Sequence, residues 1–562
     1  MRHKRLLAVA AAVPLMFTGT VNLAGATPVP ASQAQSSTIN PNTILTIGRE
    51  NNTIFTRNFN PFAPVPNLGV VTAIYEPLVI YTPTNSKYTP WLAKSWSYGP
   101  NAMSLTFNLR SGVLWSDGQP FSATDVAYTF QILKKWFAGG GFPYIKNVIA
   151  VNPTTVEFTF SQPSSIALGQ VGQQVIVPKH IWDTVSNPVD YTNPDPVGTG
   201  PFTQIENFEP QGYVIGRNPN YWQPGKPYFA GIRYPAYAGD SVNYALYKGE
   251  LDWSDLYIPD VQKTYVAKDP KHYYYFFGKT GGTINLVFNT TLKPLNDAVV
   301  RKAISMAINR QANVDSVYGN YTAVGNCTGV TPVSSWYDPA VANSCGWTTE
   351  NVAKANAMLD AAGYKRGSDG IRVSPSGQKM EFTLETGVTS SDYVQSAENV
   401  AADVKAIGID LVVTPKSWST VISDVNLGHF QVAHMYGLVA PTPYNFFDFY
   451  MACANVVPVG QTATENWGRF CDPKADKLLA RMATATTTQA QHAVADQLEA
   501  LFAADAPAVP LFTQPDWGEF NTTRFTGFPT ASNPYATGQS RYPGAFLIET
   551  TIKPVPGAFP QG

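Results

Sequence analysis

Two stretches decide how this chain is read: Val197-Gly198-Thr199-Gly200-Pro201-Phe202 and Arg217-Asn218-Pro219-Asn220-Tyr221-Trp222. The first predicts a glycine-rich bend that runs into a short strand, because glycine accepts positive φ and proline fixes φ after the bend. In the second, Asn218-Pro219 starts a turn that the two aromatic rings can pin to a core. Neither stretch holds a nucleophile, a metal-ligand cluster or a phosphate cradle.

The N-terminus is typical of an export signal. Arg2-His3-Lys4-Arg5 is basic, Leu6–Phe17 is apolar but too short to span a bilayer comfortably, and Ala24-Gly25-Ala26 is a small-residue cleavage site. We therefore expect a signal peptide over 1–26 and a flexible leader over 27–42, which is rich in Ser, Gln and Thr. An uncut membrane anchor is the alternative.

Four cysteines are available for disulfides: Cys327, Cys345, Cys453 and Cys471. None lies near the signal, so there is no lipid-attachment cysteine, and their spacing lacks the paired pattern of a zinc site. An even number in an exported protein suggests disulfides. We expect Cys327–Cys345 and Cys453–Cys471, because each pair closes a short loop rich in Gly, Asn and Pro. The two other connectivities, and free buried thiols, stay open.

Length and composition bound the class of protein. A chain of 562 residues is too long for one core and indicates two or three domains. A formal charge of −1 gives no field that would favour nucleic acid or an anionic membrane. Only 14% of residues are charged while 13% are aromatic. This balance suits recognition of neutral polar ligands by stacking, and equally a protein exposed to acid.

The pattern along the chain is mixed α/β. Leu105–Leu109 and Thr155–Phe160 alternate as strands do, and a helix is expected after Ser122 with Val126, Phe130 and Leu133 as its apolar stripe. Further helices are expected over Ala298–Arg310, Val352–Ala362 and Ser396–Ile407. The last one leads into a strand, a helix-to-strand unit of α/β type.

A glycine run lies between two well-patterned regions. Gly278, Gly281 and Gly282 permit the changes in φ and ψ that domain closure requires, so this run is the candidate hinge. An ordinary hairpin or loop is the alternative.

Six blocks together resemble one family, the extracytoplasmic solute-binding proteins of ABC importers, family 5, whose members take oligopeptides, dipeptides, nickel or oligosaccharides. The two opening stretches are among these blocks. The others are Leu92–Trp96, Phe107–Val126, Lys248–Asp252 and the run from Asn289 to Arg310. The tail from Trp517 to Ala536 also looks like the branch that binds cello-oligosaccharides.

The resemblance implies an α/β type II periplasmic-binding fold, with two lobes that close on a ligand about a hinge, plus an extra domain. Domain I would be discontinuous over 43–76, 195–282 and 505–562, domain II would be 77–194, and domain III would be 283–504. It also implies a monomer without cofactor or metal, exported to the periplasm or to the outer face of the cytoplasmic membrane. Its partners would be a small or short-oligomer ligand and the permease subunits, not nucleic acid.

The ligand class follows from a departure from the family pattern. In the family's peptide binders, an aspartate after a short strand in the second lobe pairs with the α-amine of the peptide. The matching strand here is Phe430–Leu438, and no Asp or Glu occurs between Phe430 and Phe447. Asp448 could substitute if the loop were threaded differently. Aromatic and neutral polar residues predominate instead, so we favour an oligosaccharide over an oligopeptide.

Seven residues are candidates for ligand contact, and core packing is the alternative for each ring. They are Trp418, Tyr436, Tyr444, Asn445, Trp253, Trp467 and Trp517.

An enzyme is not expected, because the sequence contains no His-Glu-x-x-His, Gly-x-Ser-x-Gly or P-loop motif. His429 and His434 are five residues apart around a strand and would face opposite sides. The acidic pair Asp252 and Asp255 leaves a secreted glycosidase as the enzyme alternative.

Overall fold

The computed structural model describes residues 39–49, 54–63, 66–137, 142–239, 241–332, 334–437 and 440–560, and only the backbone at 279–281. The predicted signal peptide and residues 27–38 of the predicted leader lie outside these ranges. At 39–42 the chain is held, because the side-chain amides of Asn40 and Asn42 donate to the carbonyl of Pro560. Within the described ranges, no helix combines the length and apolar character needed to span a bilayer.

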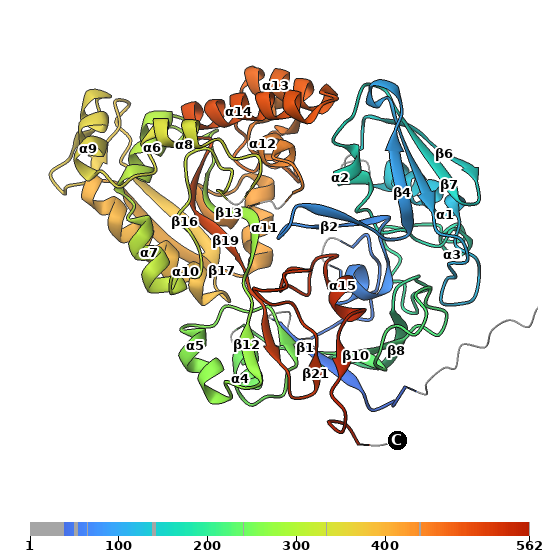
Figure 1. The fold of residues 1–562 in the computed structure, drawn as a ribbon. Coiled ribbons are helices and arrows are strands. Elements are labelled where there is room, and N and C mark those ends of the chain that lie inside the picture. Colours follow the sequence, from blue (N-terminus) through green and yellow to red (C-terminus); the bar gives the residue numbers. More distant parts are fainter. Residues whose placement is uncertain are drawn as a thin grey trace, which may run out of the picture. The chain divides into compact units, whose positions relative to one another are not determined.

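Three large sheets organise the chain (Figure 1). The first has seven strands in the order β12 (Tyr273–Tyr275), β20 (Glu519–Asn521), β11 (Trp253–Ser254), β1 (Ile44–Gly48), β10 (Gly231–Pro235), β9 (Gly212–Arg217) and β8 (Phe202–Glu209). Strand β1 is parallel to both of its neighbours, and the other pairs are antiparallel. The helices between and after these strands are short: α4 (Ser241–Tyr247), α5 (Val261–Thr264) and α15 (Ala545–Glu549).

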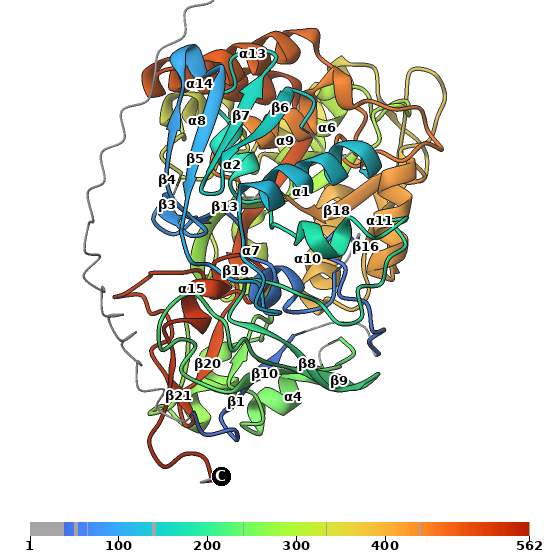
Figure 2. The same cartoon turned by 90° about the vertical axis from the view of Figure 1, so that its right-hand side faces the viewer.

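The second sheet has four antiparallel strands, in the order β4 (Ala93–Tyr98), β5 (Ser104–Leu109), β7 (Thr155–Phe160) and β6 (Ile145–Asn152). Helix α1 (Ala123–Trp136) packs on β6 and β7, as Figure 2 shows from the side. Helices α2 (Ala167–Val171) and α3 (Lys179–Trp182) follow. A hairpin of β2 (Val79–Thr82) and β3 (Lys87–Pro90) precedes this sheet.

The third sheet has five strands in the order β17 (Asp410–Lys416), β16 (Glu381–Gly387), β18 (Val432–Tyr436), β13 (Gly278–Phe288) and β19 (Ala508–Asp516). Its helices are α6 (Ala298–Ala307), α7 (Arg310–Tyr318), α8 (Pro339–Cys345), α9 (Val352–Ala361), α10 (Ser391–Val404), α11 (Trp418–Leu427), α12 (Tyr444–Met451), α13 (Pro473–Thr484) and α14 (Thr488–Asp505). Two small pairs complete the fold, β14 (Lys365–Arg366) with β15 (Arg372–Val373) and β21 (Phe525–Thr526) with β22 (Lys553–Pro554).

Local signals in the sequence set most element boundaries. The predicted strands over 105–109 and 155–160 lie within β5 and β7. At the start of α1, Ser122 and Asp125 form a reciprocal capping box, and Val126, Phe130 and Leu133 are buried as expected. The predicted helix over 352–362 is α9 with Ala362 as its C-cap, followed by Gly363 at φ +84°.

Two predicted helix boundaries were wrong. The helix expected over 298–310 is two helices, because Ile308 is extended and Asn309 caps α7 by accepting from the amide of Ala312. The helix expected to start at Ser396 starts at Ser391 instead, with Asp392 in its first turn. Its exit is a 3₁₀ turn over Lys405–Ile407 that ends at Gly408, φ +74°.

The glycines of the opening stretch serve close packing rather than positive φ. Neither Gly198 nor Gly200 has a positive φ. A Cβ atom at Gly198 would lie 2.2 Å from the carbonyl oxygen of Ile74, and one at Gly200 would lie 2.0 Å from that of Ala73. Both carbonyls belong to a π-helical turn over Val70–Ile74, so only glycine lets the bend lie against it.

The aromatic pair of the second stretch is anchored by a buried carboxylate. The indole N–H of Trp222 donates to Glu76 Oε2 at 3.0 Å, and the hydroxyl of Tyr221 donates to Glu76 Oε1 at 3.1 Å. Trp91 donates its indole N–H to the same Oε1 at 2.7 Å. Glu76 is fully buried, and burial raises its pKa to about 7.

The predicted hinge run is strand, and the alternative of a hairpin or loop at this run is wrong. Strand β13 begins at Gly278, which pairs with Asp516 of β19, and the register shifts between Lys279 and Thr283. Gly281 and Gly282 fall in that irregular part.

Strands β13 and β19 lie where the chain passes between two sheets. Strand β12 ends at Tyr275 and β13 begins at Gly278, while β19 ends at Asp516 and β20 begins at Glu519. The chain thus passes twice, within three residues each time, between the seven-stranded and the five-stranded sheet, and β13 and β19 run side by side (Figure 1). By pairing, β19 belongs to the five-stranded sheet, although the predicted boundaries put it in domain I.

Both predicted disulfides, Cys327–Cys345 and Cys453–Cys471, are present. Cys345 is the last residue of α8, and Cys471 lies just before α13.

Candidate ligand-binding site

Three of the predicted aromatic residues meet at the end of strand β18. The ring centroids of Trp418 and Tyr436 are 6.0 Å apart, and those of Tyr436 and Trp467 are also 6.0 Å apart at a nearly perpendicular angle. Tyr393 of α10 joins them edge-on, 5.1 Å from Trp418. We call these four residues the ring cluster. Tyr393 lies in α10, Trp418 opens α11, Tyr436 ends β18, and Trp467 lies in a loop. Only the tertiary packing of these elements brings the four rings together.

The ring cluster is held in place by neighbouring groups. Trp418 donates its indole N–H to Ser390 Oγ at 2.9 Å. Gly387, at the end of β16, leaves room for this ring, because a Cβ there would lie 2.1 Å from it. Trp467 packs edge-on against Phe449 at 4.8 Å. A ring fixed by its neighbours loses little rotamer entropy when a ligand stacks on it.

The ring cluster keeps polar groups available to a ligand. Tyr436 is 37% exposed, so part of this residue is open to solvent. The buried indole N–H of Trp467 has no hydrogen-bond partner in the described part of the chain. An unsatisfied buried donor is costly, and a ligand hydroxyl or a water molecule would relieve that cost.

The charge of Arg541, which lies between β21 and α15, acts on the hydroxyls of two residues of the ring cluster. Burial raises the pKa values of the Tyr393 and Tyr436 hydroxyls above 10.0, and the charge of Arg541 opposes this on both. Tyr542 raises the pKa of both hydroxyls further. The Arg541 side chain is 36% exposed, so a ligand can reach it from solvent.

Two buried aspartates orient Arg541. Its Nε lies 3.4 Å from Asp255 Oδ2, which also accepts from the amide and hydroxyl of Ser540, each at 3.1 Å. Burial lowers the pKa of Arg541, but Asp255 and Asp516 together hold it above its ordinary value. Asp516 accepts from the amide of Gly538 at 3.1 Å, and its second oxygen has no partner within the described ranges.

Tyr444 and Asn445 do not join the ring cluster. They open helix α12, and both are half-buried. Burial raises the pKa of the Tyr444 hydroxyl, and the charge of Asp448 adds to this. Burial raises the pKa of the Tyr144 hydroxyl, which lies just before β6, and Tyr444 adds to this.

Trp253 and Trp517 pack in the core instead of lining the site. Trp253 is fully buried beside Phe520 and Phe528, and its indole N–H donates to the carbonyl of Gly538 at 2.7 Å. Trp517 packs edge-on on Phe277 at 4.7 Å, directly after β19. Trp253 is fully enclosed and has no face to offer a ligand, so the core alternative describes it; Trp517, 8% exposed, packs against Phe277 and Tyr318.

The other groups considered from the sequence have structural partners. Asp448 accepts a hydrogen bond from the side-chain amide of Asn455 and shares a hydrogen bond with Glu465. Its carboxyl group is therefore already paired and is not free to bind an amine. Asp252 forms a two-point ion pair with Arg524, at 2.8 and 2.7 Å. The two carboxyl groups of the glycosidase alternative therefore have different partners, because Asp255 pairs with Arg49 and Arg541.

One of the histidines considered from the sequence, His434, lies in the core. His434 is fully buried, lies 3.0 Å from Ser396 Oγ, and burial lowers its pKa to about 3. No group of three or more His, Cys, Asp or Glu side chains in the described ranges could hold a metal ion.

Sequence reasoning missed Tyr393, Arg541 and Tyr542. No local pattern marks Tyr393, which sits in the first turn of an ordinary amphipathic helix. Arg541 follows β20 by about 20 residues in an irregular segment, and only the fold brings it to the rings.

Comparison with known proteins identifies the family. The model of the bacterial extracellular solute-binding proteins, family 5, matches residues 87–457. The chain belongs to this family. A probable ABC transporter periplasmic-binding protein of Escherichia coli, SapA, is 25% identical over 490 residues, which cover 81% of this chain and 84% of that protein. The murein peptide-binding protein MppA of the same organism is 24% identical over 504 residues, 85% of this chain and 88% of that protein.

Solved structures support the type II periplasmic-binding fold predicted from the resemblance. A periplasmic oligopeptide-binding protein of Thermotoga maritima with mannohexaose bound is 26% identical, with a TM-score of 0.83 over 92% of this chain and 99% of that chain. DppA of Helicobacter pylori, in complex with a peptide, has the same fold at 20% identity, with a TM-score of 0.74 over 92% and 98%. Assignment to the cello-oligosaccharide branch stays a prediction.

Proposed function

We propose that this family 5 protein is the substrate-binding subunit of an ABC importer, and that it holds an oligosaccharide between the ring cluster and the Arg541–Tyr542 segment. The ring cluster is the observation that carries the proposal. Sugar rings stack on aromatic faces through their C–H surfaces, and the Trp467 N–H, the Tyr436 hydroxyl and Arg541 supply donors for hydroxyl oxygens.

The lack of acidic residues along the strand that carries Tyr436, and in the loop after it, supports a neutral ligand. A peptide's α-ammonium needs a carboxylate counter-ion, and none lies between Phe430 and Phe447. Asp448, which could have replaced it, is bonded to Asn455 and Glu465. The mannohexaose bound to the Thermotoga maritima relative shows that this fold can hold a hexasaccharide in a protein described as oligopeptide-binding.

The mechanism we propose is closure about β13 and β19. A ligand that stacks on the ring cluster of the five-stranded sheet would also contact Arg541 on the other side, and so would prefer the closed form. A ligand shifts the equilibrium only by that preference. The closed form would then be recognised by the permease, at the outer face of the cytoplasmic membrane or in a periplasm, and the ligand would be released unaltered.

An oligopeptide is the second candidate, and the names of the relatives favour it. MppA binds murein peptide, and SapA of Salmonella typhimurium is described as a peptide transport protein. In this chain, the buried carboxylates of Asp255 and Asp516 beside Arg541 are the groups that could meet an ammonium.

A thermal-shift panel distinguishes the two ligand classes, because a ligand that binds the folded state raises the melting temperature. We would compare mannohexaose, cellohexaose and xylohexaose with a tetrapeptide, on the wild type and on Trp418→Ala. The control is Trp136→Ala, which removes a tryptophan at the exposed end of α1. We expect a sugar to raise the melting temperature of the wild type and of the control equally, and to raise that of Trp418→Ala less. A shift with the peptide alone would refute the oligosaccharide proposal, and cleaved sugar products would refute a binding-only role.

A further inference from the structure

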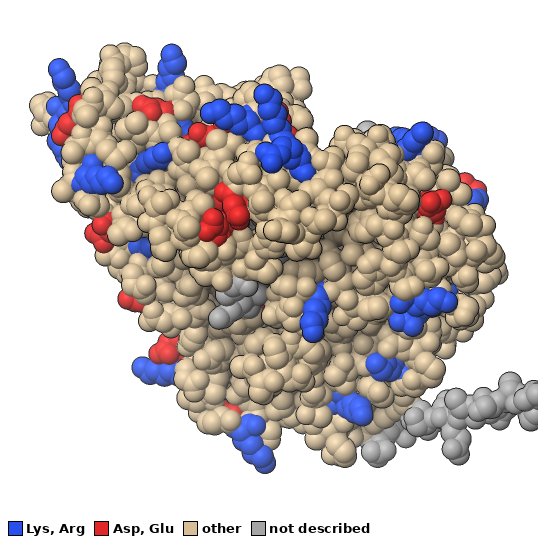
Figure 3. Space-filling model, turned by 45° about the horizontal axis from the view of Figure 1, so that its top comes forward, with Lys and Arg blue, Asp and Glu red and all other residues tan. Residues whose placement is uncertain are grey.

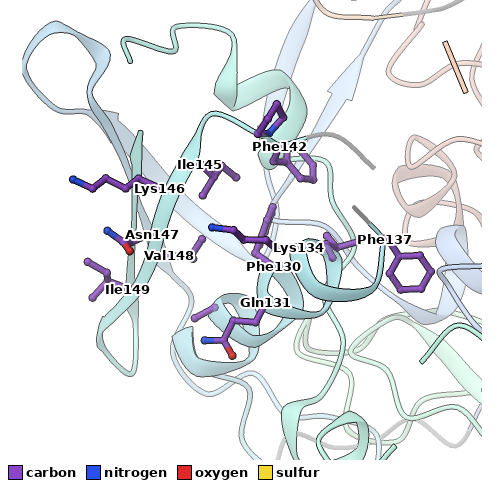
Figure 4. Close-up of a pocket in the computed structure, with 13 residues that line it drawn as sticks. Phe130, Gln131, Lys134, Phe137, Phe142, Ile145, Lys146, Asn147, Val148 and Ile149 are labelled. Carbon is purple, nitrogen blue, oxygen red and sulfur yellow. The ribbon is translucent and has the colours of Figure 1, made fainter. Parts of the chain in front are cut away.

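The domain built on the four-stranded sheet contains a cavity that is separate from the ring cluster. It has a volume of about 480 Å³ and lies between helix α1 and strand β6 (Figure 4). This volume is within the range of sites for small organic ligands, about 300–1,000 Å³. Strand β6 is the edge strand of its sheet, and its register shifts near both ends.

The walls of the cavity are apolar. Phe130 and Leu133 of α1 face Ile145 and Val148 of β6, and Phe142 closes one end against Phe130 at a centroid distance of 5.3 Å. Ile149 is 44% exposed, which leaves apolar surface open to water at the rim. Burying such surface stabilises a complex by about 25 cal/mol per Å².

The polar groups at the rim are cationic or neutral. Lys134 extends from α1 toward β6 in Figure 4, and Lys146 extends outward from β6. Neither ammonium forms an ion pair within the described ranges. The other polar lining groups are the amides of Gln131 and Asn147, and no Asp or Glu lines the cavity.

We propose that this cavity binds a small amphipathic anion, an acyl or aryl chain that ends in a carboxylate or a phosphate. The chain would fill the space between Phe130 and Val148, and the anionic group would accept hydrogen bonds from Lys134 and from the Gln131 amide. An unpaired lysine beside apolar walls favours an anion over a neutral or cationic head group. The inference is independent of which ligand the ring cluster binds.

Isothermal titration calorimetry of the full chain with decanoate tests the proposal, with decyl phosphate and uncharged decanol as parallel probes. We expect one saturable site for decanoate and decyl phosphate, and at least tenfold weaker binding of decanol. Lys134→Glu should weaken decanoate at least tenfold, because it puts a negative charge at the rim. Lys135→Glu is the matched control, since its side chain lies over Trp136 and does not line the cavity.

A second variant tests the apolar part. Val148→Phe should fill the cavity and weaken decanoate at least tenfold, with its folding checked by a melt; if it does not fold, the surface variant Lys134→Glu decides. Equal affinity in Lys134→Glu and the wild type would overturn the proposal. So would loss of decanoate binding in Trp418→Ala, which would put the anion at the ring cluster. Binding to phosphatidylglycerol vesicles without binding of free decanoate would also overturn it, in favour of a membrane contact.

Discussion

Raising the pH should destabilise this protein through a buried carboxyl group, Glu76. Its side chain is fully buried, accepts hydrogen bonds from Trp91, Tyr221 and Trp222, and burial raises its pKa to about 7 from an ordinary 4.5. The carboxyl group of Glu549 is also buried, with both oxygens unpartnered in the described part of the chain. Burial and the charge of Glu76 raise the pKa of Glu549 well above its ordinary value.

The sign follows from proton linkage. Glu76 keeps its proton up to about pH 7 in the folded state but only to about pH 4.5 in the unfolded chain. Its contribution to stability is therefore complete below pH 4.5 and is lost as the pH rises through 7. At about 1.4 kcal/mol per pH unit, the loss is on the order of 3 kcal/mol. Glu499, whose pKa burial raises to about 8, acts in the same direction.

The assay is urea unfolding of the wild type and Glu76→Gln at pH 4.5, 6, 7 and 8. Glutamine stays neutral, so the free energy of unfolding of Glu76→Gln should fall less with pH. The gap between the two proteins should change by about 3 kcal/mol in favour of the variant between pH 4.5 and 8. Glu209→Gln, at the exposed end of β8, is the control. Parallel curves for Glu76→Gln and the wild type would refute the reasoning, because Glu76 would then not titrate in this range.

Three further predictions concern the ligand, closure and the disulfides. Trp418→Ala should weaken the ligand identified by thermal shift by about 1–3 kcal/mol, the range for stacking on an aromatic ring, measured by calorimetry. Ser165, between β7 and α2, accepts from the side-chain amide of Gln491 of α14 at 2.7 Å, and its backbone amide donates to the carbonyl of Ala483 of α13 at 2.9 Å, which ties the segment after the four-stranded sheet to both helices. Gln491→Ala should therefore lower ligand affinity about threefold by reducing the closed population. Replacing Cys453 and Cys471 with serine should cost about 3 kcal/mol, since the bridge closes a separation of 18 residues.

Each of these outcomes has a contrary result. Unchanged affinity would remove Trp418 from the site. The closure argument would fail if Gln491→Ala matched the wild type in both affinity and small-angle scattering with ligand; Gln497→Ala, on the same helix, is its control. An unfolding free energy unaltered by reduction of the Cys453–Cys471 bridge would mean that the unfolded chain is constrained without it.

The sequence by itself determined the family and the elements that depend on near neighbours. The alternation of apolar and polar residues predicted strands β5 and β7, and the residues from Ser122 to Asp125 predicted the start of α1. The short glycine-rich loops between the cysteines predicted both disulfides correctly. These features depend on residues a few positions apart, so they can be read without the fold.

Tertiary structure alone decided the rest. The carbonyl that requires glycine at position 198 belongs to Ile74, more than 100 residues earlier in the chain. The pairing of β13 with β19 likewise joins segments that lie far apart in the sequence. Trp253, which the sequence offered as a ligand contact, is enclosed in the core, while Tyr393, which no local pattern marks, packs against Trp418. Whether a side chain faces a ligand or the core depends on which distant segments cover it, and that is set by packing rather than by the residues beside it.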